Sequence, residues 1–411
     1  MSNQLQLSIV TFPKGAYITV EGKANADQFF ILRTGKVQIS KEVQVVSEEG
    51  GSILSPGDFF GVVSTMSGHS HIETAQALTD VSLISVTRDK YELLIEKNTP
   101  VAMKIIESFS RQLRHLDESL ARITQKTMKG DADATHLFRV GEFYAKTNQF
   151  NLAYYAYHQY LKLCPTGPDV QKARERMAKI KPYAKPVYLD GDDTQFNRVY
   201  PKDTMIFSET MPGKELYILQ RGTIKISKLT NDNEVLLAVL KPGDIFGEMS
   251  LIENKPRMAS AIAMEESQLL AVNKENFSKM TINQPQIIAR LTTLLAKRLW
   301  LIYKQLANTL ITDPTGKLWD YLMIQLEQNR IPIKRGETFT FNFGAREIGP
   351  MVGLSAAQAN MAVMELLKSP IIKTIENRIY CTDIEELTKQ ASYYRKMQKI
   401  ELNKRSKDKV N

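Results

Sequence analysis

The sequence predicts an α+β protein that contains two small antiparallel β modules of the jelly-roll type, with helical segments after and between them. The first observation is an internal repeat, because segments of the first half return in the second half in the same order. The second is that each copy reads as short alternating strands separated by glycine turns. The third is that each copy is followed by a helical run, roughly residues 100–128 and 285–310.

The repeat is read from three pairs of matching segments. They are residues 12–14 and 200–202, 29–37 and 216–224, and 55–61 and 241–247. We therefore expect residues 1–129 to form one β domain with C-terminal helices. We expect residues 186–311 to form a second β domain that ends in its own long helix.

Composition places the chain among ordinary soluble proteins, with 24% charged and 43% hydrophobic residues. At 411 residues it should hold about three domains. Its net charge of +9 permits nucleic-acid binding without demonstrating it. Cys164 and Cys381 lie far apart, which predicts neither a disulfide framework nor a cysteine zinc site. We see no signal peptide in residues 1–13 and no apolar run that could span a bilayer, so we expect a cytoplasmic protein without a membrane partner.

The most specific pattern is FGEMSLIENKPRMASA at residues 246–261. It places one acid, Glu248, and one base, Arg257, at the two ends of a short crossover. A cyclic nucleotide requires such a pair, because a carboxylate accepts from the ribose 2′-hydroxyl and a guanidinium donates two parallel hydrogen bonds to the cyclic phosphate. The small residues Ala259 and Ser260 let backbone N–H groups approach the same anion.

This stretch resembles the phosphate-binding cassette of cyclic-nucleotide-binding domains, whose pattern F-G-E-[LMI]-[AS]-L, a short spacer and P-R-x-A-[ST] is filled at every position. The alternative is a hairpin that carries a surface Glu and Arg by coincidence. The resemblance implies a ligand site formed by Phe246, Gly247, Glu248, Met249, Arg257, Met258 and Ala259. In related domains a threonine after the arginine is associated with cGMP, so Met258 favours cAMP. We expect no metal.

The first copy differs where this chemistry would occur. Val62 stands in the place of Glu248, His71 in the place of Arg257, and Glu73 in the place of Ala259. A nucleotide there would lose its ribose acceptor and meet a carboxylate near its phosphate. We therefore predict a degenerate, structural module, and we interpret His69 and His71 as solvated loop residues rather than metal ligands.

Residues 130–185 form a different unit that resembles a tetratricopeptide repeat. Its signature positions are Leu137, Val140, Gly141, Tyr144, Ala153, Tyr157, Tyr160 and Pro165. Three or so such repeats are usually needed to stand alone. We therefore favour a helical spacer packed on its neighbours over a peptide-binding groove for a protein partner. The prolines that follow and the acidic run at residues 190–193 predict a linker.

The helix expected from Pro285 to Leu310 carries one apolar stripe. The stripe consists of Leu291, Leu295, Leu299, Ile302, Leu306 and Leu310. It predicts a homodimer, and packing against the chain's own barrel is the alternative. The residues that contact adenine in the catabolite activator protein fall here at Ile302 and Tyr303, so the resemblance implies that Tyr303 contacts the base.

Residues 290–317 and 345–355 resemble the Crp/Fnr family of transcription regulators. The resemblance implies a C-terminal winged helix-turn-helix over residues 312–390, followed by a basic tail at 391–411. Its recognition helix would run from Ser355 to Leu367, with Ser355 as N-cap, and its wing would be a hairpin over residues 371–380. The implied contacts to double-stranded DNA are Arg346, Ser355, Gln358, Asn360, Lys373 and Arg378.

This recognition helix departs from the family because it contains no Lys or Arg. Ala356, Ala357 and Met361 stand where catabolite-activator-like members carry Arg, Glu and Arg. Only Gln358 and Asn360 remain for base edges, and both side chains can read adenine. A winged helix that binds protein is therefore a serious competitor.

Two functions remain from the sequence. The first is a cyclic-nucleotide-responsive transcription regulator of the Crp/Fnr type, in which ligand bound to the second β domain controls DNA binding. The second is a cyclic-nucleotide-dependent adaptor whose helical insert and winged helix bind proteins. An enzyme is disfavoured, because the sequence contains no Walker loop, no G-x-G-x-x-G and no H-E-x-x-H.

Overall fold

The computed structural model describes residues 8–24, 26–42, 52–123, 135–189, 196–230 and 233–408. These residues divide into two compact units. The first unit contains Met1–Tyr91, Gln112–Thr124 and Leu295–Asn411, and the second contains Glu92–Arg111 and Gln125–Leu294. Two of the boundaries between the units fall inside long helices, α3 (Thr99–Ile123) and α9 (Pro285–Leu310).

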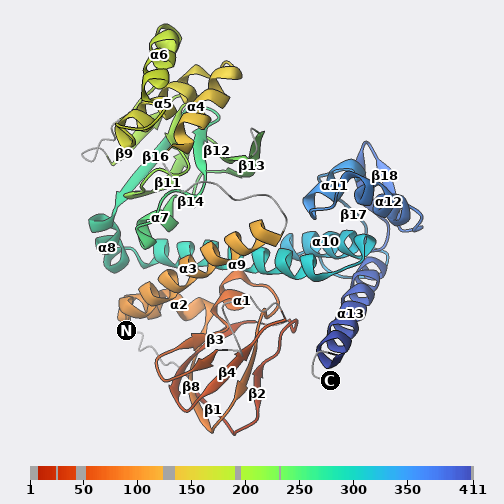
Figure 1. Cartoon of the computed structure of the whole chain (residues 1–411). Coiled ribbons are helices and arrows are strands. Elements are labelled where there is room, and N and C mark those ends of the chain that lie inside the picture. Colours follow the sequence, from red (N-terminus) through yellow and green to blue (C-terminus); the bar gives the residue numbers. More distant parts are fainter. Residues whose placement is uncertain are drawn as a thin grey trace. The chain divides into compact units, whose positions relative to one another are not determined.

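The β module of the first unit consists of two four-stranded antiparallel sheets (Figure 1). One sheet has the order β1 (Ser8–Phe12), β8 (Val81–Thr87), β3 (Gln28–Thr34), β6 (Phe59–Phe60). The other has the order β2 (Tyr17–Thr19), β7 (Thr74–Ala77), β4 (Val37–Ser40), β5 (Ile53–Leu54). Alternate apolar residues of both sheets, among them Leu32, Val37 and Leu83, form one buried core.

The second unit repeats this topology strand for strand. One sheet has the order β9 (Asn197–Tyr200), β16 (Ser267–Asn273), β11 (Glu215–Arg221), β14 (Ile245–Phe246). The other has the order β10 (Met205–Phe207), β15 (Ser260–Ala263), β12 (Ile224–Thr230), β13 (Asn233–Leu240). The register shifts at matching points, between Leu32 and Thr34 and between Leu219 and Arg221. The two predicted antiparallel β modules are therefore confirmed.

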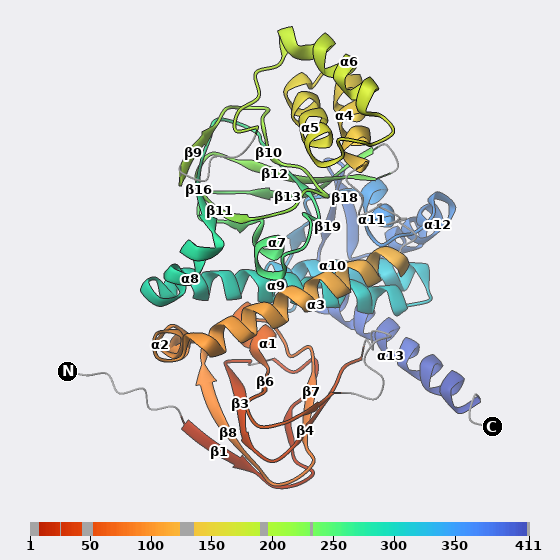
Figure 2. The ribbon, with the colours of Figure 1, turned by 60° about the vertical axis from the view of Figure 1, so that its left-hand side comes forward.

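Three helices lie against the second β module: α4 (His136–Lys146), α5 (Phe150–Leu163) and α6 (Val170–Ile180) (Figure 2). Gly141 permits close contact between α4 and α5, because a Cβ there would lie 2.6 Å from the ring of Tyr157. The Tyr155 hydroxyl donates to the carbonyl of Ile206 at 3.1 Å. The insert thus packs on its neighbour, as favoured from the sequence, while its kinship to tetratricopeptide repeats stays a prediction. The acidic run at 190–193 lies outside the described residues.

The apolar stripe of α9 is buried within the single chain. Leu291, Leu295, Leu299 and Leu306 are at most 1% exposed. Within the first unit, the Trp300 ring stacks on the His69 ring at 4.1 Å between centroids. These contacts correspond to the alternative of packing inside the chain, and the homodimer stays a prediction.

The C-terminal part of the first unit has the elements α10 (Pro314–Gln328), α11 (Ala345–Met351), α12 (Ala356–Leu367), β18 (Ile372–Ile375) and β19 (Arg378–Cys381). The hairpin pairs with β17 (Phe339–Thr340) in a three-stranded sheet. Ser355 caps α12, since its hydroxyl accepts from the Gln358 N–H at 3.4 Å. Gly349 lets α11 approach α12, because a Cβ there would lie 2.3 Å from that of Ala359. Helix, turn, helix and hairpin thus follow in the expected order.

The expected basic tail is largely a helix, α13 (Ile384–Asp408). Arg395 donates to the carboxylate of Asp320, which is buried, so Arg395 forms an internal ion pair. Lys399 lies 3.4 Å from the carboxylate of Glu42. The run is therefore helical as far as Asp408, with Arg395 in an internal ion pair and with Lys396 and Lys399 exposed. Among those residues, no helix is long and apolar enough to cross a membrane.

Candidate functional site

The strongest sequence pattern forms a tight crossover in the second unit. The chain leaves β14, turns through Gly247 and enters the short helix α7 (Glu248–Glu253) before it returns as β15. Gly247 has φ 74°, a left-handed conformation that glycine adopts without steric cost. The crossover buries both predicted charges, since Glu248 is 1% and Arg257 6% exposed.

The Arg257 guanidinium is held by neutral oxygen atoms and an aromatic ring. One terminal nitrogen, Nη1, donates to the Gly247 carbonyl at 2.5 Å and to the Ser250 hydroxyl at 2.6 Å. The other, Nη2, donates to the Glu215 carbonyl at 2.7 Å. The guanidinium lies over the Phe207 ring at 4.1 Å from its centroid. The Arg257 Nε–H has no hydrogen-bond acceptor among the described residues.

The charge of Arg257 is therefore buried without an ion pair in the described part of the chain. Burial lowers the pKa of Arg257, while the nearby phenols and the Glu248 carboxylate act in the opposite direction. A desolvated cation is costly unless an anion compensates it. A phosphate is such an anion, and it can accept from the unsatisfied Nε–H.

Two glycines make room for this guanidinium. A Cβ on Gly213 would lie 2.1 Å from the Ser250 Oγ and 2.8 Å from the Arg257 Cζ. A Cβ on Gly247 would lie 2.6 Å from the Arg257 Nη1. Sequence reasoning missed Gly213, Ser250 and Glu215. The sequence did contain a sign of the role of Gly213, because the corresponding residue of the first copy is Ala26 and not a glycine.

The other predicted ligand residues fall into two groups. The Phe246 ring stacks on Tyr217 at 5.4 Å and is 4% exposed, and Met249 is also buried, so both belong to the core behind the site. Met258 and Ala259 are half-buried and lie beside Arg257 in the chain. These two side chains are therefore partly open to solvent.

Tyr303 belongs to the first unit. Its side chain is 3% exposed, and its hydroxyl donates to the Glu21 carboxylate at 3.0 Å. Burial raises the pKa of Glu21, and the hydrogen bonds from the Glu42 N–H and from Tyr303 oppose that rise. The contact of Tyr303 with a nucleotide base stays a prediction.

The first copy has the same crossover with a different interior. Gly61, at φ 79°, leads into α1 (Val62–Ser67), and its N–H donates to the Glu73 carboxylate at 2.7 Å. Val62 and His71 are buried, and burial lowers the pKa of His71. The chain thus places its own carboxylate within its degenerate cassette.

Both loop histidines are packed against the rest of the first unit, whereas they are interpreted from the sequence as solvated. His71 is 8% exposed and His69 stacks on Trp300, so that interpretation is wrong. The described residues contain no group of three or more His, Cys, Asp or Glu side chains that could hold a metal ion.

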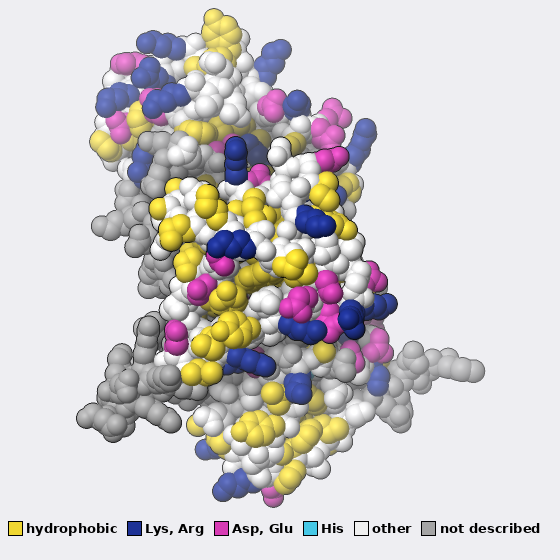
Figure 3. Space-filling model, turned by 90° about the vertical axis from the view of Figure 1, so that its right-hand side faces the viewer, with side chains coloured by type: hydrophobic (Ala, Val, Ile, Leu, Met, Phe, Trp, Pro, Cys, Tyr) yellow, Lys and Arg dark blue, Asp and Glu magenta, His cyan; other side chains and the backbone are white. Residues whose placement is uncertain are grey.

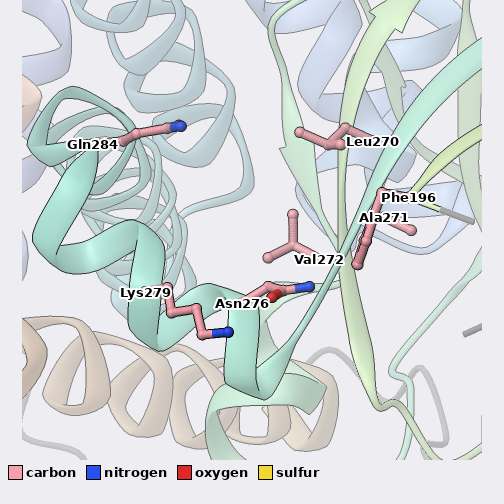
Figure 4. Close-up of a pocket in the computed structure, with 7 residues that line it drawn as sticks. All are labelled: Phe196, Leu270, Ala271, Val272, Asn276, Lys279 and Gln284. Carbon is pink, nitrogen blue, oxygen red and sulfur yellow. The ribbon is translucent and has the colours of Figure 1, made fainter. Parts of the chain in front are cut away.

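A hollow of about 340 Å³ lies between α8 (Lys274–Asn283) and β16 (Figure 4). Its lining residues are Phe196, Leu270, Ala271, Val272, Asn276, Lys279 and Gln284. The lining is mostly apolar and Lys279 is its single charged residue. It therefore lacks the paired acid and base of the crossover.

The predicted DNA contacts lie on α11, α12 and the β18–β19 hairpin. The side chains of Arg346, Lys373 and Arg378 are exposed, as are those of Gln358 and Asn360. Figure 3 shows the side of the molecule that carries these C-terminal elements, where hydrophobic side chains lie among both basic and acidic ones. Ser355 serves as the cap of α12.

Comparison with known proteins adds to this geometry. The family model described as "cyclic nucleotide-binding domain" matches residues 9–98 and 197–283, which are the two β modules. A "CRP-like cAMP-activated global transcriptional regulator" of Mycobacterium tuberculosis is 29% identical over 195 residues, which cover 47% of this chain and 86% of that protein. A "cyclic AMP receptor protein" of Thermus thermophilus is 37% identical over 103 residues, which cover 25% and 48% of the two chains.

Among solved structures, the catabolite activator protein of Thermus thermophilus aligns with 24% identity and a TM-score of 0.28. The alignment covers 48% of this chain and 90% of that one.

Proposed function

We propose that this chain, whose two β modules belong to the cyclic nucleotide-binding domain family, is a cyclic-nucleotide-responsive transcription regulator with one working ligand site. The observation that carries the proposal is Arg257, a buried guanidinium that lacks an ion pair among the described residues and has an unsatisfied Nε–H. The names of the relatives, a cAMP-activated transcriptional regulator and a cyclic AMP receptor protein, favour cAMP as the ligand.

In this proposal the cyclic phosphate accepts from the Arg257 Nε–H and from one of its terminal nitrogens. The phosphate replaces neutral acceptors such as the Ser250 hydroxyl, and charge-assisted hydrogen bonds are stronger than neutral ones. The Glu248 carboxylate accepts from the ribose 2′-hydroxyl. Met258 and Ala259 border the ligand.

The signal then passes from the second β module through α8 and α9 to the C-terminal elements. There, α11 and α12 with the β18–β19 hairpin act as a winged helix-turn-helix on promoter DNA. A ligand shifts such an equilibrium only by its differential affinity for the two states, typically about 1–3 kcal/mol of coupling free energy.

Isothermal titration calorimetry with cAMP tests the site. We expect Arg257→Ala to weaken binding about a hundredfold or more, because truncation removes the charge that pairs with the phosphate. The matched control is His71→Ala, at the corresponding position of the first copy, which should leave the affinity unchanged. Equal affinities of wild type and Arg257→Ala would reject the assigned site.

A cyclic-nucleotide-dependent adaptor is the second candidate. The exposed Met361 and Met364 of α12 favour it, because methionine side chains are common on protein-binding surfaces. A salt titration of DNA binding separates the two functions, since a protein that neutralises phosphates loses affinity steeply with salt. Absence of DNA binding at low salt, with cAMP bound, would favour the adaptor.

A further inference from the structure

One face of α12 is exposed and nearly free of charge. Ala357, Asn360, Met361 and Met364 are spaced by three, four and seven residues from the first, so they share one side of the helix. Met361 is 72% and Met364 is 69% exposed. The opposite side is buried through Ala359, Ala362 and Leu366. Apolar side chains so exposed and clustered point to a binding surface.

The chemistry of this face matches one kind of base pair. Arg and Lys read the O6 and N7 atoms of guanine, Asn reads the N6 and N7 atoms of adenine, and apolar side chains contact the thymine methyl group. α12 contains no Arg or Lys, and the adjoining Lys368 is paired with Glu365 at 2.6 Å. The Gln358 side-chain oxygen accepts from the Ser355 N–H at 3.2 Å, so Gln358 serves the helix cap.

We propose that this face of α12 reads A·T base pairs in the major groove, with Asn360 on adenine and Met361 and Met364 on thymine methyl groups. The inference rests on the proposed DNA-binding function and names the base pairs that it selects. A·T-rich double-stranded DNA is the occupant of this face.

The surrounding charges fit a DNA occupant. Arg346 on α11 and Lys373 and Arg378 on the hairpin are exposed, and no ion pair holds any of them in the described part of the chain. Phosphate contacts from such residues fix the position of a protein on the duplex, while base contacts carry the specificity. In this proposal the cations supply affinity, and the exposed face of α12 supplies specificity.

The test uses the full chain with saturating cAMP at low salt. A random duplex pool is selected for bound sequences, and the best duplex is then remade with uracil in place of thymine, which removes only the 5-methyl group. We expect A·T-rich half-sites and a several-fold weaker affinity for the uracil duplex in fluorescence anisotropy.

Three variants assign the effect to side chains. Met361→Ala combined with Met364→Ala should bind thymine and uracil duplexes equally. Asn360→Ala should lower the preference for adenine at one position by about tenfold, which is the usual scale of one bidentate base contact. Met397→Ala is the control, because Met397 is an exposed methionine on α13. All of these side chains are exposed, so circular dichroism melts should be unchanged.

Selection of G·C-rich sites, or equal binding of thymine and uracil duplexes by wild type, overturns the inference and leaves the regulator proposal standing. Loss of all DNA binding at low salt, with cAMP still bound in calorimetry, overturns both the reading face and the DNA-binding part of the proposed function. If the exposed face of α12 binds a protein and the chain does not bind DNA, the reading face and the DNA-binding part of the proposed function are likewise overturned.

Discussion

The two β modules share one frame and differ in what their crossovers contain. Both run through the same strand order, and both enter the crossover helix through a glycine with positive φ, Gly61 at 79° and Gly247 at 74°. In the second module the crossover buries the Arg257 cation without an ion pair in the described residues, whereas in the first the Glu73 carboxylate accepts from the Gly61 N–H. One backbone can therefore hold either a buried cation or a carboxylate that is bound to its own glycine N–H.

The first crossover also makes a hydrogen bond and a ring contact with other segments of its own unit. The Arg330 side chain donates to the Ser67 carbonyl at 2.7 Å, and the His69 ring stacks on Trp300. The crossover of the first copy thus contacts Trp300 of α9 and Arg330, which follows α10. The comparison teaches that the same crossover can also serve as a packing element within its own unit.

The largest expected effect comes from moving the acid of the second module into the first. Val62→Glu should lower the free energy of unfolding by about 3–5 kcal/mol, the scale of an uncompensated buried charge. Val62 is 2% exposed, and burial lowers the pKa of His71, which stands where Arg257 stands in the second module. Urea unfolding measures the change. Val62→Leu is the control, and equal stability of the two variants would mean that the crossovers are interchangeable.

The next effect concerns the glycine that distinguishes the modules. Gly213→Ala should destabilise the protein by about 1–3 kcal/mol through overpacking, and it should weaken cAMP binding because it displaces the Arg257 guanidinium. Ala26→Gly, the reverse change in the first module, should leave cAMP binding unchanged. Thermal melts and calorimetry check both variants; an unaltered cAMP affinity of Gly213→Ala would contradict the role of this glycine.

A smaller effect is expected where the helical insert contacts the second module. Tyr155→Phe removes the donor to the Ile206 carbonyl and should cost about 1 kcal/mol. Tyr154→Phe is the matched control, because Tyr154 is a half-buried neighbour in the same helix. Urea midpoints provide the measurement. If the two variants are equally stable, the insert is not held by this hydrogen bond.

The smallest effect is a pH dependence of the first module. Burial, and secondarily Arg330, lowers the pKa of His69 from 6.5 to about 4, with Lys297 and Lys304 acting in the same direction and Glu327 against it. The unfolded chain therefore binds the proton more readily, so stability is full above pH 6.5 and falls as the pH drops towards 4. His69 is half-buried, which keeps the effect small.

His69→Gln should reduce this slope in unfolding free energies measured between pH 7.5 and 4.5. The remaining titrating groups are common to both proteins, so they cancel in the difference. Identical slopes for wild type and variant would show that His69 titrates freely.

The sequence alone predicted the repeat, the antiparallel modules, the crossover pattern and the degenerate first copy. These features depend on local chemistry: alternating apolar residues, glycines at turns, and charges a few residues apart. It also predicted the order of helix, turn, helix and hairpin near the C-terminus, because Ser355 and Gly353 mark the cap and the turn.

Only the tertiary structure decided how those residues are used. It brought Arg257 to the carbonyl of Glu215, 42 residues away, and Arg330 to the carbonyl of Ser67, 263 residues away. It also buried the apolar stripe of α9 within one chain. It placed Arg395, which the sequence assigns to a basic tail, in an ion pair with Asp320. Such pairings depend on which surfaces meet after folding, and a pattern read along the chain contains no distance between residues so far apart.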